Sequence, residues 1–231
     1  MPLTQLVHYF NSQLERQARH SGVSSSIEAV DGRYQARFGD VILHTFLSPL
    51  QRLGSDELNG HYAGSLFYSS DDQQLEVDEV YEALAKPEEV IHLDRLARTL
   101  HSLNYLYRHD DLDTLLSLSV HPRHIASVTA DHGKVFEKVL ADCGLGPERV
   151  LLRIRLNRMI PLERFKQALD SYRSRGYRLA IDVETRADVL RIEQLGMALD
   201  AIFPGADWVE AGYASPWAEA LLETRRLEIR R

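Results

Sequence analysis

Cysteine is almost absent from this chain, and its scarcity excludes several classes of protein. The single Cys143 among 231 residues permits neither an internal disulfide framework nor a thiolate metal cluster. No stretch of 18 consecutive apolar residues occurs, and Met1 is not followed by a basic and then an apolar segment. We therefore expect no membrane span, no secretion signal and a cytoplasmic location.

Basic residues are also in deficit. Lys and Arg number 27 against 34 Asp and Glu, which gives a net charge of −7. Because an acidic protein repels phosphate backbones, and only the segment from Arg225 to Arg231 is basic, we expect no nucleic-acid partner. A glycine-rich phosphate loop is missing too, since Gly144-Leu145-Gly146 follows a predicted helix and is typical of a helix C-cap.

The first 40 residues predict a helix followed by a hairpin. Apolar residues at helical spacing form a stripe that ends before Gly22, and alternating apolar residues flank Asp31-Gly32, a typical hairpin turn. The stripe consists of Leu3, Leu6, Val7, Phe10 and Leu14. We expect residues 1–40 to be an N-terminal addition to a main domain at 41–231. The stripe should pack on that domain or across a homodimer interface.

The rest of the chain predicts an α/β domain. Two strands are expected near residues 41–47 and 62–68, and then an amphipathic helix with Asp94, Arg95 and Arg98 on its polar face. From Leu115 onward, strands and helices alternate, which is the pattern of a parallel sheet or barrel. The expected strands are Leu115 to Val120, Val150 to Leu156, Arg178 to Val183 and Ala201 to Phe203; the helices are Gly133 to Cys143, Leu162 to Arg175 and Arg186 to Leu195.

Candidate chemical groups gather where the predicted strands end, the usual position of ligands in such folds. Asp182 and Glu184 share a face, so they either bind a cation or, as we favour, Asp182 braces the following helix. His121 and His124 are best interpreted as part of a solvated loop, and His132 as a helix-entry residue. Four aromatic residues could form an interaction surface or could instead pack in the core. They are Tyr105, Tyr107, Trp208 and Trp217.

Six segments form an ordered series. They are Phe46-Leu47-Ser48-Pro49-Leu50, Leu93-Asp94-Arg95, Leu118 to Ile125, Gly144 to Val150, Gly176 to Asp182 and Leu199 to Ile202. The series resembles the EAL domain, a barrel family whose active members hydrolyse cyclic di-GMP with divalent metal ions. The resemblance covers about Val41 to Gly205 and implies a TIM-like α/β barrel. Only Gly212 to Pro216 weakly resembles the family's closing segment, so the barrel is expected to be modified or shortened at its C-terminus.

The resemblance places the family's functional positions on five residues. Its metal-binding Asn and Glu correspond to Ser119 and Arg153, its paired acids to Asp182 and Val183, and its Lys to Phe203. Only Asp182 keeps the family's residue type. Because Arg153 puts a cation where metal catalysis needs an anion, we expect a vestigial site with no catalytic residue, metal or cofactor. Arg153 and Asp182 should instead form a salt bridge.

These positions lead to three functional hypotheses. The first is a catalytically inactive EAL-like regulator, not an enzyme, that binds another protein in bacterial signalling, motility, biofilm formation or virulence. The alternative is a non-hydrolytic cyclic di-GMP receptor. Leu47 and Tyr68-Ser69-Ser70 replace expected Gln and Arg residues, and argue against binding of cyclic di-GMP. The third, a residual hydrolase, relies on Asp182 with Glu184.

Overall fold

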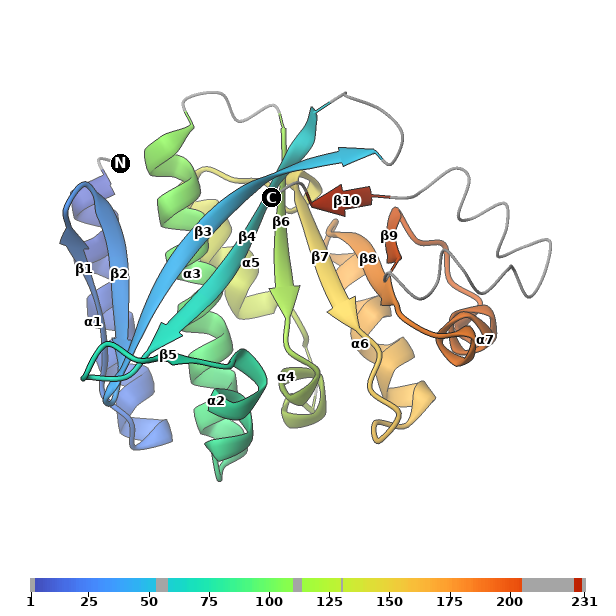
Figure 1. The fold of residues 1–231 in the computed structure, drawn as a ribbon, viewed down its shortest axis with the longest axis horizontal. Coiled ribbons are helices and arrows are strands. Elements are labelled where there is room, and N and C mark those ends of the chain that lie inside the picture. The colour runs from blue at the N-terminus through green and yellow to red at the C-terminus, as the bar shows by residue number, and fades with distance from the viewer. Residues whose placement is uncertain (1–2, 53–57, 110–113, 130, 205–226, 230–231) are drawn as a thin grey trace.

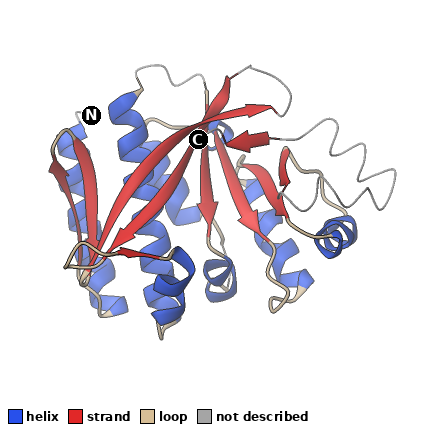
Figure 2. Cartoon of the chain, in the orientation of Figure 1, coloured by secondary structure: helices blue, strands red, loops and turns tan. Residues whose placement is uncertain are grey.

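A curved mixed sheet with helices on one face forms the molecule (Figure 1). The computed structural model describes residues 3–52, 58–109, 114–129, 131–204 and 227–229. The strand order is β1-β2-β3-β4-β6-β7-β8-β9, with β5 on β4 and β10 on β3. Figure 2 distinguishes the helices from the strands in the same view. None of the described helices is long and apolar enough to cross a bilayer.

The elements follow one another as a helix and strands first, then alternating strands and helices. The first part comprises α1 (Leu3–Ser21), β1 (Ser25–Val30), β2 (Arg33–Phe38), β3 (Val41–Arg52), β4 (Leu58–Tyr68), β5 (Gln74–Leu75), α2 (Val77–Ala83) and α3 (Pro87–Arg108). The second comprises β6 (Leu115–Val120), α4 (Pro122–Ser127), α5 (Lys134–Cys143), η1 (Pro147–Arg149), β7 (Val150–Arg155), α6 (Leu162–Ser174), β8 (Arg178–Val183), α7 (Arg186–Leu195), β9 (Ala201–Pro204) and β10 (Leu227–Ile229).

The predicted N-terminal helix and hairpin are present. Asp31 and Gly32 both have positive φ, 48° and 72°, as a two-residue hairpin turn with right-handed strand twist requires. Asn11 of α1 fixes β1, because its side-chain amide donates to the Ile27 carbonyl and accepts from the Ile27 N–H. The apolar stripe of α1 lies in one core cluster with β2 and α3. The stripe is therefore covered within the chain.

The sheet is antiparallel in its first part and parallel in its second. β3 runs antiparallel to both β2 and β4, whereas β4, β6, β7, β8 and β9 are mutually parallel. Among the described residues, β9 has no hydrogen-bonded neighbour beyond β8, and β10 pairs with β3. The structure thus has the predicted mixed α/β fold without showing barrel closure. Trp208, Trp217 and Gly212 to Pro216 lie outside the described residues.

Two apolar cores cover the two faces of the parallel strands. The larger core packs β6, β7 and β8 against α5, α6 and α7. A smaller cluster lies on the opposite face and contains Leu50, Leu151, Ala180, Ala201 and Phe203. Burial on both faces explains why these strands are nearly continuous apolar runs in the sequence.

The helix α3 is buried almost all round, which contradicts the predicted polar face. Asp94 and Arg98 are 1% and 2% exposed and form an ion pair with each other, and Arg95 alone of the three is partly exposed. The polar face predicted from helical periodicity is wrong because α3 packs between α1, the sheet and α5. Charged residues on an all-round buried helix must pair internally.

Two buried histidines of α3 join it to three strands and α1. His101 lies between the hydroxyls of Thr45 and Ser65, at 2.7 and 2.9 Å from its ring nitrogens. His92 lies in the same way between the Ser21 and Ser25 hydroxyls, at 2.8 and 2.7 Å. Burial lowers the pKa of His101 to about 3 and that of His92 to about 4. Both rings are therefore neutral at pH 7.

We predict that Phe10→Ala destabilises the protein by about 3–5 kcal/mol, because it removes a buried aromatic ring from the shared core. Urea denaturation measures the free energy of unfolding. The exposed Glu15 on the same helix provides the control, and Glu15→Ala should change that energy by less than about 0.5 kcal/mol. Equal effects of the two substitutions would mean that α1 is not docked.

We also predict that stability falls as the pH drops below about 6.5. His101 binds a proton readily only when unfolded, so its contribution is complete above pH 6.5 and is lost progressively toward its folded pKa of about 3. His101→Asn should flatten the pH dependence of the unfolding free energy by up to about 1.4 kcal/mol per pH unit between pH 6 and 4. His8 is exposed, so the control variant His8→Asn should leave the pH dependence of the unfolding free energy unchanged. An unchanged slope in His101→Asn would contradict the assignment.

Candidate functional site

A cleft of about 340 Å³ opens where the parallel strands end. The side chains that line the cleft come from β4, β6, β7 and β8 and from the segment that enters α2. Its lining residues are Tyr62, Glu76, Val77, Asp78, Ser119, Val120, His121, Pro122, Arg153, Arg155, Asp182 and Glu184. The carboxyl ends of parallel strands are the usual location of ligand sites in α/β proteins, so the cleft is the candidate site.

The strand register determines which side chains share the cleft. Ser119 is level with Arg153, and Arg155 is level with Asp182, which is level with Phe203. Partners in a register point to the same face, so these side chains lie on the face away from the main helical core. Val183 faces the other way and is buried in that core.

Arg153 and Asp182 form the predicted salt bridge. The Arg153 Nε donates to Asp182 Oδ1 at 2.5 Å, and both side chains are about one-fifth exposed. The contact is diagonal, because the strand register sets Asp182 level with Arg155 and not with Arg153. The Arg153 guanidinium also lies over two aromatic rings, 4.4 Å from the Phe203 centroid and 5.2 Å from that of Tyr62. Such stacking restricts the guanidinium to one orientation.

Burial dominates the electrostatics of Asp182. Desolvation raises the pKa of its carboxyl, and the neighbouring Arg153 opposes that rise only in part. The carboxylate is therefore costly to keep ionised in the cleft. Tyr62 completes this part of the site with a hydroxyl 3.1 Å from the Ser119 hydroxyl.

A second ion pair lies at the entrance of the cleft. Arg155 Nη2 donates to Asp78 Oδ1 at 2.6 Å, and the His121 ring nitrogen is 3.2 Å from the same oxygen. The hydrogen bond from Arg155 is the largest influence on Asp78 and lowers the pKa of its carboxyl. The His121 ring also stacks on Tyr81 with centroids 3.8 Å apart. The guanidinium of Arg155 and the ring of His121 therefore lie side by side at the entrance, both in contact with Asp78.

The interpretation of His121 and His124 as a solvated loop is wrong. His121 is the N-cap of α4, and its ring accepts a hydrogen bond from the Arg123 N–H. His124 is buried, and its Nδ1 is 3.3 Å from Asp94 Oδ2. Burial lowers the pKa of His124 to about 3. His132 does lie just before α5, as predicted, and is also buried.

The buried Asp94 supports the cleft from behind. One of its oxygens accepts from Arg98 and the other from the His121 backbone N–H, at 3.2 Å. Burial alone raises the pKa of Asp94, but Arg98, His124 and this N–H together hold it below its usual value. The segment that carries His121 is therefore tied to α3.

The cleft does not offer a metal-binding set. Within the described part of the chain, no group of three His, Cys, Asp or Glu residues is arranged to hold a metal ion. Asp182 is engaged by Arg153, and Asp78 by Arg155. Calcium and magnesium usually take several oxygen ligands. The residues present therefore do not fit the divalent ions of the family that the sequence resembles.

The geometry defines a mixed α/β protein with a ligand cleft at the carboxyl edge of its parallel strands. Comparison with solved structures refines this class to an EAL-like fold. No family model and no curated protein sequence matches the chain.

Three solved structures illustrate the similarity. One is Klebsiella pneumoniae BlrP1 in a manganese and cyclic di-GMP complex, with TM-score 0.55, 17% identity, and coverage of 79% of this chain and 43% of that one. The Bacillus subtilis YkuI protein, with an EAL domain, in complex with substrate cyclic di-GMP and calcium, has TM-score 0.53, 17% identity and coverage of 70% and 40%. A standalone EAL protein from Vibrio cholerae O395, bound to cyclic di-GMP, has TM-score 0.56, 12% identity and coverage of 78% and 73%.

These comparisons correct two predictions. The expectation that the chain is not an enzyme is contradicted, because the neighbours are EAL proteins and one is described with its substrate. The argument against cyclic di-GMP is also contradicted, since all three neighbours are in complex with it. The chain spans less than half of the Klebsiella and Bacillus proteins.

Sequence reasoning did not single out several residues of the cleft, among them Arg155, Tyr62 and Asp78. Arg155 was detectable, because it lies two residues after Arg153 and so shares its face. Tyr62 falls within the strand expected near residues 62–68, but nothing in the pattern singles it out. Asp78 reaches the cleft only through the position of α2, which no local signal reveals.

We predict a coupling free energy of about 1–3 kcal/mol between Arg153 and Asp182 in a double-mutant cycle of alanine substitutions. The value lies between those of exposed and buried pairs, because each side chain is about one-fifth exposed. The more exposed pair of Arg155 and Asp78 is the control and should couple by less than about 1 kcal/mol. Denaturant unfolding supplies all the values. A coupling near zero for Arg153 and Asp182 would contradict the interpretation.

Proposed function

We propose that the chain binds cyclic di-GMP in the cleft at the carboxyl ends of its parallel strands. The observation that carries the proposal is a pair of arginines, Arg153 and Arg155, on one face of β7 within the cleft. Residues two apart on a strand are separated by about 6.6 Å, so their guanidinium groups are spaced to meet two anionic groups of one ligand. Cyclic di-GMP carries two phosphates.

The two arginines would exchange partners on binding. Each now pairs with a carboxylate, Asp182 or Asp78, through one nitrogen–oxygen contact, and phosphate oxygens accept charge-assisted hydrogen bonds of the same kind. Asp78 is half exposed and is easily returned to water. Burial raises the pKa of the Asp182 carboxyl, and loss of the Arg153 contact would raise it further, which favours uptake of a proton. Exchange of one anion for another keeps the net cost of binding low.

Aromatic groups in the cleft suit the guanine bases. The ring of His121 lies flat on Tyr81, and the ring of Tyr62 lies beside Arg153. Bases stack on aromatic and guanidinium planes, with about 1–3 kcal/mol for each stacked base. A ligand with two bases and two phosphates therefore matches the chemistry of the lining.

The replacements at Leu47 and Tyr68-Ser69-Ser70 do not exclude cyclic di-GMP from the cleft. Leu47 packs against the main helical core, and it is not among the residues that line the cleft. Ser69 closes the turn after β4 with a hydrogen bond to Asp71. The cationic groups come from β7 instead: Arg153, which the comparison with family motifs treated as a lost metal ligand, and Arg155, which that comparison did not single out.

A regulatory role through a protein partner stays a prediction. So does the assignment of residues 1–40 as an addition and 41–231 as the main domain, although α1 and the hairpin share a core with α3. The vestigial status of Ser119, Arg153, Asp182, Val183 and Phe203 is likewise untested. The proposal requires only that Arg153 and Arg155 face a bound anion.

We predict that Arg155→Ala weakens cyclic di-GMP binding by about 10- to 100-fold, as loss of a charge-assisted hydrogen bond worth about 1.5–3 kcal/mol implies. Isothermal titration calorimetry measures the affinity. Arg33 on the hairpin strand β2 is also exposed and lies outside the cleft, so Arg33→Ala controls for the loss of one positive charge. Equal affinities for wild type and Arg155→Ala would contradict the proposed site.

A further inference from the structure

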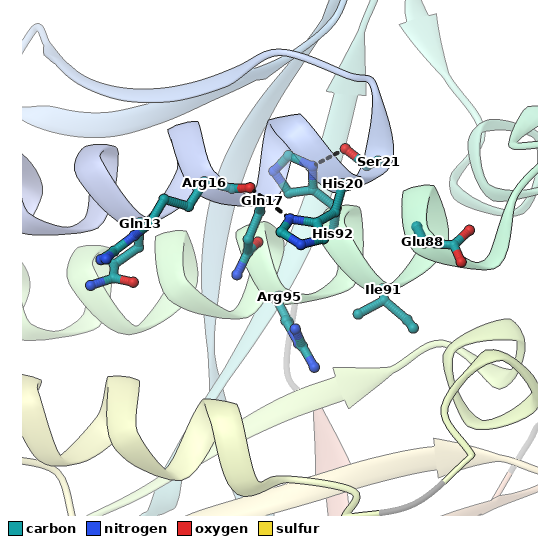
Figure 3. A pocket seen from close by; sticks show the side chains of 9 residues that line it. All are labelled: Gln13, Arg16, Gln17, His20, Ser21, Glu88, Ile91, His92 and Arg95. Atoms are coloured by element: carbon teal, nitrogen blue, oxygen red, sulfur yellow. Dashed lines mark hydrogen bonds between the residues drawn. The ribbon is translucent and has the colours of Figure 1, made fainter.

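A second, larger pocket lies between α1 and α3. Its volume is about 560 Å³, and it shares no lining residue with the strand-end cleft. Figure 3 shows side chains from both helices around it. The lining consists of Gln13, Arg16, Gln17, His20 and Ser21 of α1 and Glu88, Ile91, His92 and Arg95 of α3.

Arg95 is the unusual residue of the pocket. Its side chain is partly exposed, and in the part of the chain that the structure describes its guanidinium has no hydrogen bond or ion pair. The neighbouring Asp94 is already engaged by Arg98 and the His121 N–H. Burial lowers the pKa of Arg95 and repulsion by Arg98 adds to the effect, whereas Asp94 and Tyr172 oppose it in part. An anion in the pocket would relieve both costs.

The other charged residues of the pocket also favour an anionic ligand. Arg16 adds a second guanidinium from the opposite helix, and Glu88 is the one acid among the lining residues. In Figure 3, Glu88 lies at the far end from Arg16. The lining thus holds two arginines and one acid, in a chain whose net charge is −7. Arginine forks suit phosphate, to which they donate paired hydrogen bonds.

The uncharged residues indicate that the ligand is larger than a free anion. Gln13 and Gln17 present amide groups that both donate and accept hydrogen bonds, as sugar hydroxyls and base edges require. Ile91 supplies an apolar wall, and the His92 ring is fixed by its two serine partners. The volume lies within the range of about 300–1,000 Å³ for small-molecule sites.

We infer that this pocket binds a small organic phosphate, with Arg95 and Arg16 holding the phosphate and Gln13 and Gln17 contacting the organic part. The ligand would bridge α1 and α3. Occupancy would then stabilise the docking of the N-terminal helix, and the site is independent of the strand-end cleft.

Calorimetry on the full chain tests the inference, with AMP as the probe, inorganic phosphate as the minimal anion and adenosine as the uncharged comparator. AMP should bind more tightly than phosphate, and adenosine at least 10-fold more weakly than AMP. Arg95→Gln and Arg16→Gln should each weaken AMP binding by at least 10-fold. Arg19 is exposed on α1 but outside the pocket, so Arg19→Gln should leave the affinity unchanged.

Two further measurements on these variants distinguish loss of the site from misfolding and from binding in the strand-end cleft. Arg95→Gln removes an unpaired charge, so its melting temperature should not fall. Arg155→Ala should bind AMP as the wild type does. The inference is overturned if AMP fails to bind at millimolar concentration or if Arg95→Gln binds it normally. It is also overturned if Arg155→Ala abolishes binding, which would place AMP in the strand-end cleft.

Discussion

The buried ion pair of Asp94 and Arg98 on α3 is the constraint on which the candidate site depends. Both residues are almost fully buried, and an unpaired charge at either position would cost several kcal/mol. Asp94 uses its second oxygen to hold the His121 N–H at the carboxyl edge of β6. His121 in turn contacts Asp78, which pairs with Arg155. A chain of polar contacts thus links the central helix to the entrance of the cleft.

Much of the fold could be predicted because its elements carry local signals. The Asp31-Gly32 turn, the stripe of α1 and the apolar runs of β6, β7 and β8 are properties of short segments. The burial of Asp94 and Arg98 was not predictable, since it depends on α1 and α5 covering α3 from both sides. The antiparallel pairing of β3 with β4 also depends on long-range register. Helical spacing alone could not distinguish an exposed polar face from an internal ion pair.

The candidate site was predictable at its centre and not at its margins. Arg153 and Asp182 occupy the ends of neighbouring strands, so their contact follows from sheet geometry once the strands are recognised. The role proposed for Arg153 differs from the one expected from the sequence. A guanidinium repels a metal ion but attracts a phosphate. The sequence comparison scored Arg153 as the loss of a ligand, whereas the cleft places it between two aromatic rings with Arg155 nearby. The EAL-like fold therefore carries two arginines of its own in the cleft, Arg153 and Arg155, among four acidic residues.

Hydrogen–deuterium exchange with and without cyclic di-GMP tests the central claim most directly, because it reports where the ligand lies. The account predicts slower exchange in the peptides that contain His121, Arg155 and Glu184, at the ends of β6, β7 and β8. Exchange in α1 should remain unchanged, since α1 contributes nothing to the cleft. Protection confined to α1 and the first turns of α3, or no protection at saturating ligand, would contradict the claim that the strand-end cleft binds the cyclic dinucleotide.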